Sequence, residues 1–209
     1  VAQAFADDVR AAGGEILLDT PARSIERVDG TARVNGEHEF DLLVLCAGLQ
    51  SDRLARAAGD DEEPRIVPFR GEYYRLAPER EGLVRGLLYP VPDPAYPFLG
   101  VHFTRRVHGG VDVGPNAVLA FAREGYRRRD VRLGDVAETL RSRGFRALAR
   151  RHWRMGLHEL HGSFSKAAYA TEAARYVPAV TADDLVPAHA GVRAQALDPD
   201  GSLVDDFRI

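Results

Sequence analysis

Aromatic and β-branched residues dominate residues 65–126, and Pro, Gly and Asp punctuate them at short intervals. This pattern predicts three or four antiparallel strands joined by turns. Polar side chains interrupt the predicted strands at Arg70, Tyr73, Arg75, Tyr89, His102 and Arg105. A sheet with one buried face should alternate apolar and charged positions, so this clustering favours a pocket for an anionic, oxygen-rich small molecule. The alternative is that each arginine is solvated and each tyrosine is half-buried in the core.

The first 60 residues show shorter patterns. Apolar residues four positions apart predict a helix over residues 1–13, and a short strand is expected over 15–18. The pair Asp29-Gly30 is a hairpin turn signal between two further strands. The continuous apolar run at residues 42–46 is typical of a strand buried on both faces, and a short helix is expected over 51–58.

Helical patterns follow residue 126 in three segments, at residues 135–143, 145–161 and 165–176. Asp135 is the expected N-cap of the first segment. Strands return from Pro187 onward, with the last one expected over residues 202–207. The order of elements predicts an α+β fold with one shared core, in which helices accompany an antiparallel mixed sheet.

Composition excludes several classes of protein. Of the 209 residues, 45% are hydrophobic and 28% are charged, which argues against disorder, and the net charge of -3 gives no sign of nucleic-acid binding. No apolar run reaches the roughly 18 residues that a membrane span requires. The single cysteine, Cys46, excludes an internal disulfide and a cysteine-based zinc cluster. We expect a cytoplasmic location, with peripheral association at the inner membrane as an alternative. His158 and His161 share a helix face but lack a carboxylate at ligand spacing, so no metal site is expected.

Two short motifs contain small residues that would let a ligand approach the backbone. Ala47 and Gly48 follow the apolar run, where a cofactor could come close, although most such turns are merely tight. Gly191 precedes Arg193 by two positions on a predicted strand, so both residues lie on one face. The guanidinium fork of Arg193 suits a carboxylate, and surface decoration is the alternative.

His102 lies between Val101 and Phe103, so its side chain should point away from its apolar neighbours. A histidine in that position could act as a general base near neutral pH, or be a hydrogen-bonded structural residue. A Gly-rich phosphate-binding turn occurs nowhere in the chain, so a nucleotide could not be held by it in the usual way. The chain starts without Met inside a predicted helix and stops inside a predicted strand, which suggests a piece of a longer protein.

Six segments together resemble a known family: residues 67–73, 89–94, 97–102, 114–121, 190–195 and 203–207, with the sequences VPFRGEY, YPVPDP, PFLGVH, GPNAVLAF, AGVRAQ and LVDDF. They are similar to the L-2-hydroxyglutarate oxidase/dehydrogenase family, which belongs to the FAD-dependent D-amino-acid-oxidase-like superfamily. The resemblance covers essentially the whole chain.

The resemblance implies a parent enzyme that oxidises L-2-hydroxyglutarate to 2-oxoglutarate, with hydride transfer from C2 to FAD. It implies that residues 1–60 are a remnant of the FAD-binding domain, that 61–187 form the substrate-binding domain, and that strands in 188–209 return toward the cofactor. The Gly-rich FAD motif and a C-terminal tail would lie outside this chain. The chain alone is therefore expected to be inactive and not to bind FAD.

Site roles follow from the same resemblance. Ala22 would contact the adenine side of FAD through its backbone, Ala47 and Gly48 would line the cofactor, and Gly191 would lie near the isoalloxazine ring. Arg193 would bind the substrate carboxylate.

The remaining roles are inferred from chemistry. His102 is the expected base, one of Arg70 or Arg105 should bind the second carboxylate, and Tyr73 and Tyr89 should complete the substrate site. Three alternatives stay open. The chain could be an inactive module that binds dicarboxylates or a protein partner, or belong to a related FAD oxidase of another 2-hydroxy or 2-amino acid. Apolar surface exposed by truncation could also drive self-association.

Overall fold

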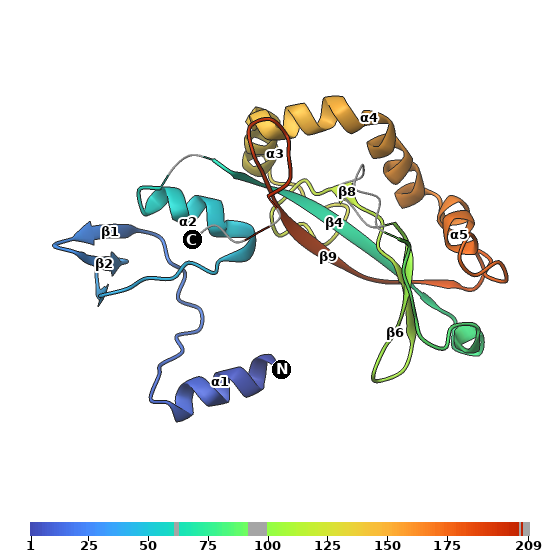
Figure 1. The fold of residues 1–209 in the computed structure, drawn as a ribbon, viewed down its shortest axis with the longest axis horizontal. Coiled ribbons are helices and arrows are strands. Elements are labelled where there is room, and N and C mark those ends of the chain that lie inside the picture. Colours follow the sequence, from blue (N-terminus) through green and yellow to red (C-terminus); the bar gives the residue numbers. More distant parts are fainter. Residues whose placement is uncertain (61–62, 92–99, 205, 207–209) are drawn as a thin grey trace. The chain divides into compact units, whose positions relative to one another are not determined.

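The structure is a computed structural model that describes residues 1–60, 63–91, 100–204 and 206. It divides into two compact units, one of residues 1–45 with 53–60 and one of residues 46–52 with 61–209. Figure 1 shows the elements of both units. Residues 92–99, which carry part of the family resemblance, lie outside the described residues.

The first unit contains one helix and a small antiparallel sheet. Helix α1 spans Ala2–Ala11, and strands β1 (Ile25–Val28), β2 (Thr31–Val34) and β3 (His38–Phe40) pair in sequence order. The hairpin turn predicted at Asp29-Gly30 is confirmed. Both residues have positive φ, 49° and 90°, as the tight turn between two twisted strands requires.

The predictions of two strands in this part of the chain are wrong. The structure shows no strand over residues 15–18, and none over 42–46, where Leu42 is 80% and Val44 is 70% exposed. A strand forms when its backbone groups find a neighbour, and among the described residues no strand pairs with either segment. The short helix that follows is confirmed as α2, Ser51–Ala57.

The second unit is built on a six-stranded sheet whose pairings are all antiparallel. Its long central strand is β4 (Arg65–Leu76), and the others are β5 (Leu87–Leu88), β6 (His102–Arg105), β7 (Val111–Gly114), β8 (Val118–Leu119) and β9 (Leu185–Leu197). Strands β7 and β8 each pair with part of β4, and β9 pairs with β4 along nearly its whole length. The predicted antiparallel sheet is therefore confirmed.

The three helices predicted after residue 126 are also confirmed, as α3 (Leu133–Arg141), α4 (Arg143–Phe164) and α5 (Lys166–Ala174). Ser142 and Ser165 cap α4 and α5, since each hydroxyl accepts a backbone N–H of the first turn. The N-cap of α3 is Arg132 and not Asp135. The carboxylate of Asp135 instead accepts the backbone N–H of Arg123 at 2.9 Å, because the loop that contains Arg123 lies against the start of the helix.

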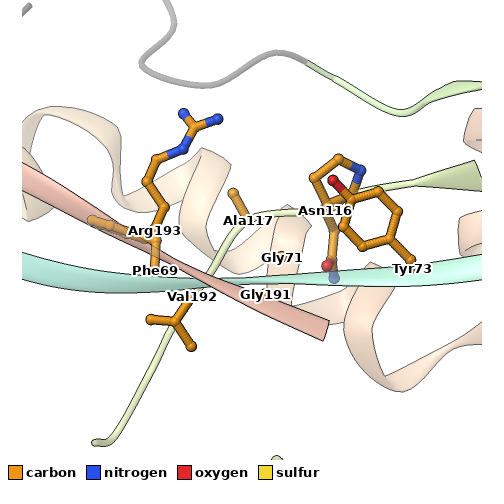
Figure 2. Close-up of a pocket in the computed structure, with 9 residues that line it drawn as sticks. Phe69, Gly71, Tyr73, Asn116, Ala117, Gly191, Val192 and Arg193 are labelled. Carbon is orange, nitrogen blue, oxygen red and sulfur yellow. The ribbon is translucent and has the colours of Figure 1, made fainter. Parts of the chain in front are cut away.

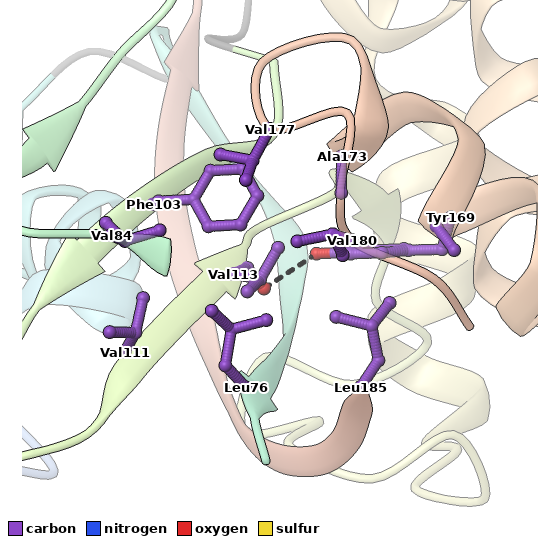
Figure 3. Packing of buried hydrophobic residues seen from close by; sticks show 11 residues of the cluster. Leu76, Val84, Phe103, Val111, Val113, Tyr169, Ala173, Val177, Val180 and Leu185 are labelled. Atoms are coloured by element: carbon purple, nitrogen blue, oxygen red, sulfur yellow. Dashed lines mark hydrogen bonds between the residues drawn. The ribbon is translucent and has the colours of Figure 1, made fainter. Parts of the chain in front are cut away.

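The main core lies between one face of the sheet and helix α5. Phe103, Val113 and Leu76 alternate inward from three neighbouring strands and are at most 1% exposed. Tyr169 of α5 packs against them, and its hydroxyl donates to the carbonyl oxygen of Val113 at 3.0 Å (Figure 3). Because side chains alternate along a strand, the residues next to these three point to the other face.

The C-terminal end of the chain also departs from the expected pattern. Of the strand expected over residues 202–207, the described part shows a single bridge between Leu197 and Leu203. Residues 205 and 207–209 lie outside the described residues.

Candidate active site

A hollow of about 230 Å³ lies beside the middle of strands β4 and β9. Its lining consists of Phe69, Gly71, Tyr73, Pro115, Asn116, Ala117, Gly191, Val192 and Arg193. Three of the residues proposed from the sequence, Tyr73, Gly191 and Arg193, are therefore brought to one place.

The register of the two strands explains this grouping. Phe69 lies opposite Arg193 and Gly71 lies opposite Gly191, so all four residues belong to one face of the β4–β9 pair. Because glycine has no side chain, this pair lines the hollow with backbone atoms alone. In Figure 2, Tyr73 and Arg193 rise on the same side of the two strands, and Val192 points to the other side.

The two glycines differ in what covers them. A Cβ added to Gly71 would lie 2.8 Å from the Cβ of Pro115, so the loop after β7 packs directly on this residue. A Cβ added to Gly191 would meet nothing within 4 Å. The backbone at Gly191 is thus open to close approach, next to the guanidinium of Arg193.

His102 lies on the same face of the sheet, on strand β6. It pairs with Gly114, and a Cβ at Gly114 would lie 3.3 Å from the Cδ1 of Tyr73. The imidazole stacks on the ring of Tyr89 at 4.4 Å between centroids. The Tyr89 hydroxyl in turn lies 3.2 Å from the Oγ1 of Thr104. His102 and Tyr89 are therefore brought together on this face, but neither lines the hollow.

The contacts of His102 define its tautomer. Its Nδ1 lies 3.2 Å from the carbonyl oxygen of Gly100, and a carbonyl only accepts hydrogen bonds. Nδ1 therefore carries the proton, and the lone pair of Nε2 can accept one. Burial lowers the pKa of His102, against a smaller opposing effect of the Gly100 hydrogen bond, so the ring is neutral near pH 7.

Tyr73, which lines the hollow, contacts a second histidine. Its ring stacks on that of His189 at 4.9 Å, and burial raises the pKa of its hydroxyl. The negative charge of Asp112 raises this pKa further, and the positive charge of Arg193 lowers it. His189 was not among the residues singled out from the sequence. Its position two residues before Gly191 on the same strand is the signal that could have found it.

Arg70 and Arg105 are placed elsewhere. Arg70 is 4% exposed, and its guanidinium bonds the carboxylate of Glu72 at 3.0 Å, on the face of β4 opposite to Gly71 and Tyr73. Arg105 donates to the carbonyl oxygen of Val84 at 3.1 Å. Neither arginine lines the hollow, because the side chains of both point to the opposite face of the sheet.

The carboxylate of Glu72 is the centre of a buried network that the sequence reasoning missed. It accepts hydrogen bonds from Arg70, Arg128, Ser163 and Asn116. Burial alone would raise the pKa of Glu72, but the hydrogen bonds of Arg128 and Ser163 and the charges of both arginines outweigh it and lower the pKa. The spacing of Arg70 and Glu72, two positions apart on one strand face, was the available signal for an ion pair.

This network also fixes the loop that covers Gly71. The side-chain oxygen of Asn116 accepts the backbone N–H of Glu72 at 2.9 Å, and the backbone N–H of Ala117 donates to Glu159 of helix α4 at 2.8 Å. Burial raises the pKa of Glu159. The wall of the hollow is therefore held by carboxylates on two different elements.

The other residues proposed for a cofactor lie apart from these strands in sequence. Ala22 belongs to the first unit, in the segment before β1. Ala47 and Gly48 belong to the second unit, where the turn η1 (Gly48–Gln50) packs against β4 and β9. Gly48 has a φ of +52°, and a Cβ there would meet nothing within 4 Å.

A buried ion pair anchors that turn. The guanidinium of Arg123 bonds the carboxylate of Asp52 at 2.9 Å and also donates to the carbonyl oxygen of Leu49. Asp52 in addition accepts the backbone N–H of Ile66 on β4 at 3.1 Å. The residues around Gly48 are thus fixed to the sheet of the second unit.

Two further findings concern the described residues alone. Among them, three or more His, Cys, Asp or Glu side chains are nowhere grouped to hold a metal ion. None of the helices in this part of the chain is long and apolar enough to cross a membrane.

Comparisons with known proteins agree with these observations. Residues 1–208 match the family model described as FAD dependent oxidoreductase. The chain is 47% identical to L-2-hydroxyglutarate dehydrogenase of Escherichia coli K12 over 211 residues, which cover 99% of this chain and 50% of that protein. It is also 47% identical to the mitochondrial L-2-hydroxyglutarate dehydrogenase of Nematostella vectensis, covering 99% of this chain and 49% of that one. The chain thus spans about half the length of the curated relatives it matches.

A solved structure shares the fold. L-alpha-glycerophosphate oxidase from Mycoplasma pneumoniae with FAD bound superposes with a TM-score of 0.64 at 19% identity, over 93% of this chain and 43% of that one. The α+β architecture with antiparallel sheets is therefore that of an FAD-containing oxidase. Because the family model covers nearly every residue, the chain belongs to the FAD dependent oxidoreductase family.

Proposed function

We propose that this chain is the substrate-binding part of an enzyme that oxidises L-2-hydroxyglutarate to 2-oxoglutarate. The observation that carries the proposal is a set of polar side chains on one face of the sheet: Arg193 and Tyr73 line the hollow, and His102 of β6, stacked on Tyr89, lies on the same face. The similarity to L-2-hydroxyglutarate dehydrogenases supports the choice of substrate.

Each of these side chains has a role that its chemistry fits. Arg193 binds the carboxylate next to the reacting carbon through two parallel hydrogen bonds. The hydroxyls of Tyr73 and Tyr89 donate to the substrate and orient it. The Nε2 of His102 takes the proton of the C2 hydroxyl, since this nitrogen has the free lone pair and the ring is neutral near pH 7.

The second carboxylate needs a partner other than the arginines expected from the sequence, because Arg70 and Arg105 do not line the hollow. We assign it to His189, whose ring stacks on Tyr73 and so supplies an imidazole to the same set. An N–H of the His189 imidazole would donate a hydrogen bond to that carboxylate.

The residues of this chain fit FAD in part. Gly191 and Gly48 leave open space over their backbones, so a flat ring system and a ribityl chain can come close. Within the second unit we assign Gly191 to the isoalloxazine side and Ala47 and Gly48 to the rest of the cofactor; the contact of Ala22 with the adenine side stays a prediction from the sequence. The chain has no Gly-rich turn for the pyrophosphate, and we assign that role to the half of the relatives' length that this chain does not cover. When bound, FAD accepts the two electrons that leave C2.

A complete parent protein tests the proposal. We expect it to be yellow, with flavin absorbance near ~450 nm, and to reduce an artificial acceptor with L-2-hydroxyglutarate. Activity on glycine or D-amino acids without activity on L-2-hydroxyglutarate would overturn the choice of substrate and leave the oxidase class. The absence of flavin from a folded parent would overturn the proposal that it is an FAD-dependent enzyme.

For the chain alone we propose the second function, a module that binds dicarboxylates without turnover. The missing phosphate turn and the half-length match to the relatives favour it. Isothermal titration of the 209-residue chain with 2-oxoglutarate should show binding, and the preparation should be colourless.

A further inference from the structure

Ala117 contributes a small side chain to the wall of the hollow. It lies one position before strand β8, whose first residue, Val118, pairs with Arg70 and is 3% exposed. The side chain of Arg70 points to the face of β4 opposite to the hollow, and the side chains of paired residues share a face. Continuing the alternation by one residue puts Ala117 on the face with the hollow. In Figure 2 its methyl group lies between Arg193 and Tyr73.

The space around this methyl group is lined by little else than backbone. Gly71 and Gly191 contribute no side chains, and a Cβ at Gly191 would meet nothing within 4 Å. Larger side chains lie at the two ends of the hollow, Arg193 at one and Tyr73 at the other. A larger residue at position 117 would therefore project into the space between the guanidinium and the phenol ring.

The backbone at Ala117 has little freedom to retreat from such a residue. Its N–H donates to the carboxylate of Glu159 on helix α4 at 2.8 Å. The preceding residue, Asn116, is 5% exposed and is bound to Glu72 twice. The Asn116 side-chain oxygen accepts the backbone N–H of Glu72 at 2.9 Å, and its nitrogen donates to the Glu72 carboxylate at 3.3 Å. Atoms added at position 117 would therefore take volume from the hollow of about 230 Å³.

The two ends of the hollow correspond to the two ends of the proposed substrate. Arg193 is the assigned partner of the carboxylate next to the reacting carbon. His189, which stacks on Tyr73, is the assigned partner of the second carboxylate. The carbon chain that joins the two carboxylates must then pass Ala117. Beyond C2 this chain has one methylene group in L-malate, two in L-2-hydroxyglutarate and three in L-2-hydroxyadipate.

We propose that Ala117 determines the chain length of the 2-hydroxy dicarboxylate that the enzyme accepts. The charged groups at the ends select the class of substrate, and the alanine methyl group leaves room for the two methylene groups of L-2-hydroxyglutarate. A pocket wall discriminates by about 10–200-fold for one methylene group that it admits or excludes. The inference rests on the proposed function, because it uses the orientation of the substrate between Arg193 and His189.

Steady-state kinetics of the complete parent enzyme with these three acids test the proposal. A117V adds two methyl groups to the wall and should lower kcat/KM for L-2-hydroxyglutarate at least about tenfold relative to that for L-malate. A117G removes one methyl group and should raise kcat/KM for L-2-hydroxyadipate about tenfold relative to that for L-2-hydroxyglutarate. The two variants act in opposite directions, so a folding defect in one leaves the other as the test.

Binding without turnover separates the fit of the ligand from the chemistry. Glutarate and succinate differ by one methylene group, and neither has a hydroxyl group to oxidise. In isothermal titration of the parent enzyme, A117V should lose more affinity for glutarate than for succinate. The control A167V makes the same substitution at an exposed position of helix α5 and should keep the preferences of the unaltered enzyme.

Equal changes of kcat/KM for the three acids in both variants would overturn the proposal, because residue 117 would then act through the fold alone. A shift of preference in A167V as large as that in A117V would also overturn it. In both cases the unaltered parent still oxidises L-2-hydroxyglutarate, so the proposed function stands. A parent that oxidises none of the three acids overturns the proposed function itself, and this inference with it.

Discussion

Gly71 of β4 and Gly191 of β9 lie directly opposite each other, yet only Gly71 is covered, by Pro115. G71A should therefore destabilise the second unit by about 1–3 kcal/mol, because the added methyl group overlaps a ring that cannot move freely. G191A should leave the free energy of unfolding within about 0.5 kcal/mol or raise it slightly. Urea unfolding of the two variants checks this, and equal destabilisation by both would contradict the assignment of an open and a closed glycine.

Replacement of Glu72 should be among the most damaging single changes outside the apolar core. E72Q leaves the guanidinium of Arg70, whose side chain is 5% exposed, without its buried counter-charge, and should cost about 3–5 kcal/mol. E39Q is the matched control, since Glu39 is 53% exposed in its pair with Arg33, and should cost at most about 1 kcal/mol. Chemical denaturation at neutral pH compares them.

The same carboxylate predicts a pH dependence. The pKa of Glu72 is lowered in the folded state, so the unfolded chain binds its proton first as the pH falls. The stabilisation by Glu72 is fully present above its ordinary value of about 4.3 and is lost as the pH drops through the lower folded value. Unfolding curves between about pH 7 and 3 should therefore fall more steeply for the unaltered chain than for E72Q. Parallel curves would show that another group is responsible.

The side chain of Phe103 should stabilise the second unit mainly through packing. Its side chain is fully buried against helix α5, so F103A should cost about 3–5 kcal/mol. F164A removes a ring that is 76% exposed and should change the free energy of unfolding by no more than about 0.5 kcal/mol. Comparable losses for both would mean that the ring of Phe164 is covered in solution.

The role of His102 predicts a feature of the pH–rate profile of the parent enzyme. Because burial lowers the pKa of His102, the acid limb of kcat/KM should lie below the ordinary histidine value of about 6.5. H102Q should lower kcat by about 10²–10⁴-fold and remove that limb. A limb that persists in H102Q would assign the base to another group.

Much of the second unit follows from local patterns. The alternation within β4 separates Tyr73 from Glu72 in any structure in which this segment is a strand, and the serines before α4 and α5 cap them through short-range hydrogen bonds. The apolar run at residues 42–46 was wrongly predicted to be a strand, because strand formation depends on neighbours that the pattern does not specify.

The grouping of site residues depends on non-local register. Gly191 and Arg193 meet β4 more than a hundred positions away in the sequence, so only the residue types in the hollow could be predicted. The types alone did not distinguish Arg193, which lines the hollow, from Arg70, which is buried in an ion pair on the other face. His189 and Asn116 were missed for the same reason, since their contacts with Tyr73 and Glu72 depend on the pairing of distant segments.

The account depends most on Arg193 as the carboxylate partner, and steady-state kinetics of the parent enzyme with L-2-hydroxyglutarate test this directly. R193K replaces a two-pronged donor by a point charge, and should raise KM and lower kcat/KM by at least about tenfold. R105K, outside the hollow, should leave both constants nearly unchanged. The opposite order, with R193K unaffected and R105K impaired, would contradict the proposed site.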